Sequence, residues 1–179
     1  MTLTITKPVV LIGMMGAGKS YMGAKLAAAL GVPFHDSDAL VEERAGHSVG
    51  EVFEVFGEEK FRESEARVIQ NLLEQGPSVI STGGGAVTNP QTLAAIKDKA
   101  LSVWLNPDLD ILVKRVKSGD KRPLLAGQDP AEKLSALLDE RRHLYRQADI
   151  TLDIHNDNKR ETLERLIKAL SETANSARF

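Results

Sequence analysis

The chain has 179 residues and a formal net charge of −2, which is the size and charge balance of one soluble globular domain without a nucleic-acid or membrane partner. It contains no cysteine, which excludes a disulfide framework and a thiolate metal site. No apolar run is long enough to cross a membrane, and residues 1–7 lack the basic region and apolar core of a signal peptide. We therefore expect a single domain over residues 1–179 that is a monomer in the cytoplasm.

The first predicted strand, residues 9–13, is apolar and runs directly into a glycine-rich turn. The turn matches the pattern G-x-x-x-x-G-K-[ST], with Gly13, Gly18, Lys19 and Ser20 in the fixed positions, and an Ala- and Leu-rich helix follows it. Glycines allow backbone N–H groups to point at phosphate oxygens, while the lysine would reach the β- and γ-phosphates and the serine would bind Mg²⁺. The alternative is a tight turn that binds nothing. The strand before the turn and the helix after it favour a nucleotide-binding P-loop.

Strands and helices alternate through the rest of the chain. Strands are predicted at 32–35, 78–82, 101–105 and 150–154, and helices at 39–45, 48 to about 57, 58–75, 90–99, 108–117, 131–147 and 161–170. This alternation indicates an α/β fold with a parallel sheet covered on both faces. In such sheets ligands bind at the carboxyl ends of the strands, so the segments that follow strands should converge on one cleft. Residues 118–130 are rich in glycine, proline and charge, and predict a mobile loop.

Two carboxylates, Asp36 and Asp38, follow the second predicted strand on what we expect to be extended chain, and the glycines Gly83 to Gly85 follow the third. Carboxylates in this position suit the water shell of a metal ion and the hydroxyl group of a substrate. The alternative is that Asp38 or the serine before it caps the next helix. Three glycines let a ligand lie directly on the backbone, although a flexible turn has the same composition.

Three arginines stand in charged segments. Arg122 lies in the 118–130 loop, where an arginine can close over phosphates and stabilise their transfer, although it could also be a loose surface residue. Arg62 lies in the run Phe61-Arg62-Glu63-Ser64-Glu65, and such runs are commonly solvated helix faces. Arg141 lies in Glu140-Arg141-Arg142-His143-Leu144-Tyr145, where ion pairs are the plainer interpretation. The four histidines have no shared ligand spacing, and we do not assign them to a metal site.

Taken together, these segments resemble shikimate kinase. The motifs Gly-x-x-Gly-x-Gly-Lys-Ser, Asp-Ser-Asp, Phe-Arg-x-x-Glu, Ser-Thr-Gly-Gly-Gly, Arg-Pro-Leu-Leu and Glu-Arg-x-x-x-Tyr occur in that family's order over residues 9–170. Each motif after the first is weak alone, but the ordered set is specific. The resemblance implies a P-loop kinase three-layer fold with a five-stranded parallel sheet, acceptor-binding helices at about 39–75 and a mobile lid at about 118–130. It also implies transfer of the ATP γ-phosphoryl group to the 3-hydroxyl of shikimate, with Mg²⁺, in aromatic amino-acid biosynthesis.

The resemblance further implies roles for individual residues. For nucleotide binding it implicates Gly16, Ala17, Gly18, Lys19, Ser20, Tyr21, Arg115, Arg122 and Asp157. For shikimate binding it implicates Asp38, Arg62, Gly83, Gly84, Gly85 and Arg141, with Glu65 orienting its neighbours. Mg²⁺ would be held by Ser20 and, through water, by Asp36. The catalytic residues would be Lys19, Asp38 and Arg122.

Two positions depart from the family pattern. Tyr21 stands where the family usually has threonine, next to the metal-binding serine. Asp157 and Lys159 stand where the family usually has arginine or glutamine followed two residues later by proline, in a loop that normally borders adenine. The side-chain contacts to the base are therefore expected to differ in this chain.

Other P-loop functions fit the sequence less well. A nucleotide kinase or a gluconate-type sugar-acid kinase is disfavoured by the Asp-Ser-Asp and triple-glycine pair. A GTPase switch would need Asp-x-x-Gly, yet no aspartate here has glycine three residues later, and the segment 158–161 ends in glutamate rather than the aspartate of a guanine-reading motif. Nucleotide binding without catalysis is disfavoured by the intact Lys19, Ser20 and Asp38.

Overall fold

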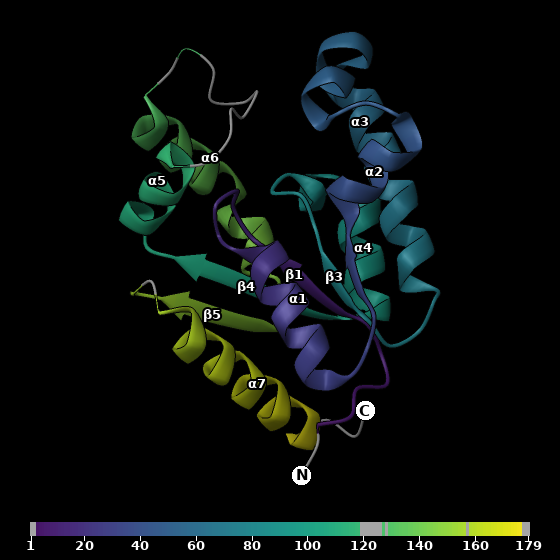
Figure 1. Ribbon diagram of the computed structural model, residues 1–179, viewed down its shortest axis with the longest axis vertical. Coiled ribbons are helices and arrows are strands. Elements are labelled where there is room, and N and C mark those ends of the chain that lie inside the picture. Colours follow the sequence, from purple (N-terminus) through teal and green to yellow (C-terminus); the bar gives the residue numbers. More distant parts are fainter. Residues whose placement is uncertain (1–2, 119–126, 128, 157, 177–179) are drawn as a thin grey trace.

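The computed structural model describes residues 3–118, 127, 129–156 and 158–176. Within these residues the centre is a sheet of five parallel strands in the order β2-β3-β1-β4-β5 (Figure 1). The strands are β1 (Val9–Ile12), β2 (Phe34–Asp36), β3 (Val79–Ser81), β4 (Leu101–Pro107) and β5 (Ile150–Ile154). The parallel sheet predicted from the sequence is confirmed.

Helices cover both faces of this sheet. They are α1 (Lys19–Leu30), α2 (Ser37–Ala45), α3 (Val49–Leu73), α4 (Pro90–Lys99), α5 (Leu109–Lys117), α6 (Pro130–Tyr145), α7 (Lys159–Ser176) and the short 3-10 turn η1 (Ala86–Thr88). Helices α1 and α7 lie side by side on one face and α4 on the other, while the pairs α2/α3 and α5/α6 stand on either side of the turn that follows β1 (Figure 1). No helix in the described part of the chain is long and apolar enough to cross a membrane.

Local sequence sets the ends of these helices. Gly31, with a φ of 68°, ends α1 in the left-handed conformation that glycine adopts most easily. Ser48 and Glu51 form a capping box at the start of α3, in which the Ser48 N–H donates to the Glu51 carboxylate over 2.8 Å. Inside α3, Gly57 has a φ of 82° and a ψ of 164° and divides the helix into two segments. The break near residue 57 that the sequence predicts is confirmed.

Three local predictions are corrected. Strand β4 runs to Pro107 rather than residue 105, because Asn106 and Pro107 still pair with β5. Helix α7 extends over Lys159–Ser176 rather than 161–170, because it packs along β5 and α1. Asp38 lies in the first turn of α2 rather than on extended chain, because Asp36 already caps that helix.

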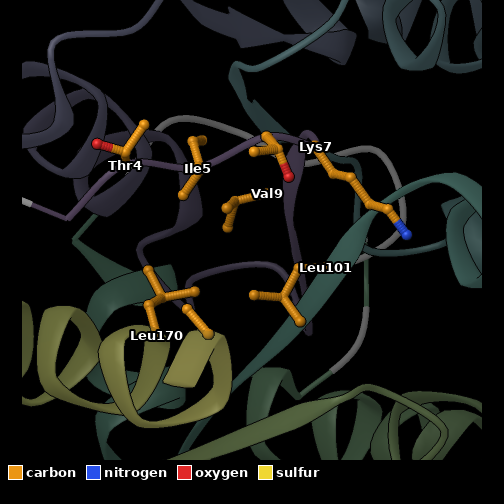
Figure 2. A pocket seen from close by; sticks show the side chains of 8 residues that line it. Thr4, Ile5, Lys7, Val9, Leu101 and Leu170 are labelled. Carbon is orange, nitrogen blue, oxygen red and sulfur yellow. The ribbon is translucent and has the colours of Figure 1, made fainter. Parts of the chain in front are cut away.

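Apolar side chains gather at the amino ends of β1 and β4. There a cavity of about 30 Å³ lies between Ile5, the first residues of β1 and β4, and Leu170 of α7, with the Lys7 side chain directed away from it (Figure 2). This volume holds one or two water molecules at most, which is too little for a ligand. The polar residues that can bind a ligand gather instead at the carboxyl ends of the strands.

Candidate active site

The turn after β1 has the backbone of a phosphate-binding loop. Gly13, Gly16 and Gly18 have φ values of 137°, 79° and 90°, which are conformations that residues with a side chain rarely adopt. A Cβ on Gly13 would also lie 2.6 Å from the carbonyl oxygen of Leu105 in β4. Gly18 is the N-cap of α1, and no side chain caps this helix end. The first-turn N–H groups of α1 therefore point at the space in front of the loop, where an anion is the natural partner.

Two cationic side chains hold the P-loop from opposite sides. Lys19, which is 7% exposed, donates through Nζ to the carbonyl oxygens of Gly13 and Met14, both at 2.8 Å. From α5, Arg115 donates through Nη1 to the carbonyl oxygens of Gly16 and Ala17 at 3.1 and 3.0 Å. The loop is therefore fixed in its curled form by this chain's own residues.

Beside the loop, side-chain oxygen atoms of Ser20, Asp36 and Ser81 lie close together. The Ser20 hydroxyl donates to Asp36 Oδ2 over 2.5 Å, and the Ser81 hydroxyl lies 3.4 Å away. The other oxygen of Asp36 caps α2 by accepting from the N–H groups of Asp38 and Ala39. The described residues hold no cluster of three or more His, Cys, Asp or Glu side chains that could hold a metal ion. Such a sparse set of oxygen atoms fits Mg²⁺, which keeps several waters and is commonly bound by few protein groups together with substrate phosphates.

These segments line one cleft of about 280 Å³. The P-loop, Tyr21, Asp36, Asp38, Gly83, Gly84 and Arg115 all border it. The expectation that the ends of β1, β2 and β3 converge is therefore confirmed. Arg62 and Arg141 do not line this cleft: Arg62 lies against Gly85, and Arg141 lies beside the Tyr145 hydroxyl, which itself contacts the Gly84 carbonyl oxygen.

The triple-glycine segment leaves room for charged side chains of the chain itself. A Cβ on Gly83 would lie 2.5 Å from Glu65 Oε1 and 2.7 Å from Asp38 Oδ1, and a Cβ on Gly85 would collide with the Arg62 guanidinium. A side chain at Gly83 or Gly85 would therefore displace these charged groups, and a Cβ on Gly84 would lie 3.0 Å from the Met15 nitrogen of the P-loop. Gly83 and Gly84 also border the cleft, and contact between a ligand and this backbone stays a prediction.

Around these glycines lie buried charged atoms with unused hydrogen-bonding capacity. Arg62 donates through Nη1 to Glu65 Oε2 at 2.7 Å, and its Nη2 lies 3.4 Å from Glu58. Arg141, on α6, is only 5% exposed. Among the described residues, no hydrogen-bond partner is found for Asp38 Oδ1, Arg62 Nε, Glu65 Oε1, or Nε and Nη1 of Arg141. Buried charged atoms are costly to leave unpaired, so this set suits a ligand that accepts from guanidinium groups and donates to carboxylates.

The electrostatic balance of the two carboxyls follows from their burial. Burial raises the pKa of Asp38, and the nearby Asp36 charge raises it further, while Lys19 and Arg62 lower it. Burial also raises the pKa of Glu65 to about 7, against the lowering effect of Arg62. Glu65 is 1% exposed, so it takes up and releases its proton near neutral pH inside the protein.

Comparison with known proteins decides the family. A family model described as shikimate kinase matches residues 15–171. Shikimate kinase of Rhodopseudomonas palustris is 45% identical over 93% of this chain and 82% of its own. The structure titled as shikimate kinase from Acinetobacter baumannii in complex with shikimate has a TM-score of 0.89 at 32% identity and covers 93% of this chain and 94% of that one. Shikimate kinase from Bacteroides thetaiotaomicron has a TM-score of 0.87 at 31% identity, covering 93% and 99%. The chain belongs to the shikimate kinase family.

Membership of the shikimate kinase family settles the class of reaction. The chain is a kinase that uses ATP to phosphorylate shikimate, a step of aromatic biosynthesis. The P-loop kinase fold expected from the resemblance is likewise confirmed. Two residues given roles in the sequence analysis, Arg122 and Asp157, lie outside the described residues, as does most of the predicted lid at 118–130.

One residue of the kinase site was missed by the sequence analysis. The Tyr145 hydroxyl, buried at the end of α6, donates to the Gly84 carbonyl oxygen over 2.5 Å, and its ring stacks on Trp104 at 5.7 Å. Burial raises the pKa of Tyr145 to about 12, so it remains a donor at any physiological pH. The signal was present in the sequence, because Tyr145 ends the Glu-Arg-x-x-x-Tyr motif and follows Arg141 by one helical turn.

Replacing Glu65 with glutamine should flatten the pH dependence of stability. The folded protein holds the Glu65 proton to about pH 7, whereas the unfolded chain releases it near 4.5, so the stability contributed by the neutral form is lost as pH rises between these values. Each pKa unit corresponds to about 1.4 kcal/mol. Urea unfolding at pH 5 and pH 8 should show a smaller loss for Glu65→Gln than for the wild type. Glu63→Gln, an exposed change on the same helix, should behave as wild type. Equal losses in all three proteins would contradict the assignment.

Proposed function

We propose that the cleft holds Mg²⁺ and ATP on the P-loop side and shikimate on the triple-glycine side, and transfers the γ-phosphoryl group to the 3-hydroxyl of shikimate. The observation that carries this proposal is the set of buried unpaired atoms on Asp38, Arg62, Glu65 and Arg141. Two guanidinium groups suit a carboxylate, and two carboxyl groups suit hydroxyls, which is the polar content of an acid that carries several hydroxyl groups. In the transfer, a bond forms between the acceptor oxygen and the γ-phosphorus, the bond to the β,γ-bridging oxygen breaks so that ADP leaves, and the hydroxyl proton passes to the Asp38 carboxylate.

On the nucleotide side, the backbone of Gly16 to Tyr21 would bind the phosphate oxygens. Lys19 would neutralise charge on the transferred group. Its ammonium, which here donates to two loop carbonyl oxygens, would then donate to phosphate oxygens instead. Ser20 would bind Mg²⁺ directly and Asp36 through water. When bound, Mg²⁺ would neutralise charge on the phosphates.

On the acceptor side, Arg62 and Arg141 would hold the carboxylate of shikimate, since the guanidinium fork matches a carboxylate in a way that lysine does not. Asp38 would accept from the ring hydroxyls and could take the proton of the attacking one. Glu65 would hold Arg62 in place. Catalysis here asks for positioning more than for deprotonation, because phosphoryl transfer has a loose transition state.

Several expectations from the sequence stay predictions. They are the catalytic role of Arg122 on a mobile lid over residues 118–130, nucleotide contacts of Asp157, a single domain, a monomeric state, a cytoplasmic location and the absence of nucleic-acid and membrane partners. An assay of ADP release with shikimate, gluconate and nucleoside monophosphates would separate the proposed acceptor from the two alternative kinases. Activity only with shikimate is the expected result.

Lys19→Met should abolish turnover. Removing the ammonium leaves developing charge on the transferred group without its buried partner, and losing one such interaction lowers kcat by about 10²–10³-fold or more. ADP release in a coupled assay measures this, and circular dichroism shows whether the variant folds. Lys25→Met, on an exposed part of the same helix, is the control and should keep wild-type kcat. A folded Lys19→Met protein with normal kcat would rule out the P-loop role.

Arg62→Lys and Arg141→Lys should each raise KM for shikimate tenfold or more, because a lost charge-assisted contact is worth about 1.5–3 kcal/mol. KM for ATP should change little. Arg142→Lys, a half-exposed neighbour that lies near Asp139, is the matched control and should leave both constants unchanged. A titration with the methyl ester of shikimate tests the carboxylate contact itself. If the ester binds the wild type as well as the acid does, no arginine pair holds a carboxylate.

Lys159 should help to hold the nucleotide in this chain, through Tyr21. Tyr21 borders the cleft beside Ser20, and the Lys159 ammonium lies 4.6 Å from the centre of its ring. Lys25 lies 5.9 Å from the same ring but one helical turn further from the phosphate end of α1. Lys159→Ala should therefore raise KM for ATP about two- to fivefold, the size of an exposed cation–π contact, whereas Lys25→Ala should not. Equal effects of both changes would contradict this role.

A further inference from the structure

A second cavity lies outside the kinase cleft, between α2 and α3. Its volume is about 400 Å³, within the range of small-molecule sites. Val41 and Val52 are buried in its wall, and the ring of Phe56 is 54% exposed at its border. Phe56 is an apolar ring left largely open to solvent beside a hollow that is large enough to take another ring.

The charge around this cavity has one sign. Arg44, Lys60 and Arg67 line it, and no carboxylate among the described residues does. Lys60 pairs with Glu63 at 3.0 Å. Arg44 and Arg67 have neither an ion pair nor a hydrogen bond with any other described residue. Single surface arginines are ordinary, but here two of them border one hollow with apolar walls.

The cavity is separate from the kinase site, although one helix serves both. Helix α3 presents Lys60 and Arg67 to the cavity, whereas Arg62 and Glu65 of the same helix lie against the triple-glycine segment. The wall also includes Val52, which precedes the break at Gly57, so both segments of α3 contribute to it. A ligand here would contact neither the P-loop nor the residues around the glycines.

We propose that this cavity binds a small organic anion that carries an apolar ring, such as an aromatic carboxylate or an aryl phosphate. The ring would lie against Phe56, Val41 and Val52, and the anionic group would lie between Arg44 and Arg67. A guanidinium group suits either anion because its N–H groups match two oxygen atoms at once. The apolar wall would add hydrophobic contacts with the ring, which a free inorganic ion cannot make.

Phenyl phosphate is a suitable probe. It would be titrated into the full chain, with the kinase site saturated by shikimate and ADP, and binding followed by calorimetry. We expect saturable binding with one site per chain. Arg44→Glu and Arg67→Glu should each weaken it at least fivefold. Arg165→Glu, an exposed change on α7, is the matched control and should leave it unchanged.

Two comparison ligands separate the ring from the charge. Inorganic phosphate and benzyl alcohol should each bind at least fivefold more weakly than phenyl phosphate, and Phe56→Ala should reduce the difference between phenyl phosphate and inorganic phosphate. The proposal is overturned if phenyl phosphate shows no saturable binding to the saturated enzyme, or if Arg44→Glu and Arg67→Glu bind it as the wild type does. It is also overturned if the face proves to be buried between two copies of the chain, which gel filtration would show as a dimer that Phe56→Ala dissociates.

Discussion

The site depends on how closely charged side chains approach the backbone of Gly83 to Gly85. Asp38 and Glu65 reach the position that a Cβ on Gly83 would take, and Arg62 reaches that of Gly85. These side chains come from α2 and from α3, so an added methyl group at Gly83 or Gly85 would force their charged ends to move, whereas one at Gly84 would press on the Met15 nitrogen of the P-loop. On the far side of the segment, Tyr145 fixes the Gly84 carbonyl. Because the three glycines have no side chains, α2, α3 and α6 can all place side chains against the segment that follows β3.

Lys19 links this point to the P-loop. Its ammonium is bonded to two loop carbonyls, and its charge lowers the pKa of both Asp38 and Glu65 while burial raises them. A nucleotide phosphate that takes up the charge of Lys19 would reduce its support for the two carboxylates. Anion binding in one half of the site would therefore favour proton uptake in the other, and Asp36, which accepts from Ser20 and raises the pKa of Asp38, is a second link between the two halves.

The sequence was sufficient for the architecture, because alternating strands and helices with glycine at the turns allow few arrangements. The P-loop was predictable residue by residue, since its spacing is fixed by phosphate geometry. The reason for the triple glycine was not predictable, because it depends on Arg62 and Glu65, which lie about twenty residues earlier in the chain and approach only in three dimensions. Tyr145 belongs to a recognisable motif, but its role was not predictable, because its partner is a backbone carbonyl, which has no sequence signature. Strand and helix ends moved by a few residues where pairing with β5 or a cap at Asp36 decided them.

The acceptor half of the site also selects ligand charge. Arg62 is already paired with Glu65 and lies near Glu58, whereas Arg141 has no carboxylate partner among the described residues, so Arg141 carries the charge that is not compensated. Glu58 is largely exposed and screened by water, and Lys19 faces the P-loop, so the charges to balance in the acceptor half are those of Asp38, Glu65, Arg62 and Arg141, which sum to zero when both carboxyls are ionised. With one proton held, which the raised pKa of Glu65 allows near neutral pH, they sum to one positive charge. A ligand with a single carboxylate balances that charge, while a phosphate dianion would leave buried negative charge in excess. Buried excess charge is strongly unfavourable, so a site with the proposed residue roles would favour an acid over a nucleoside monophosphate on electrostatic grounds.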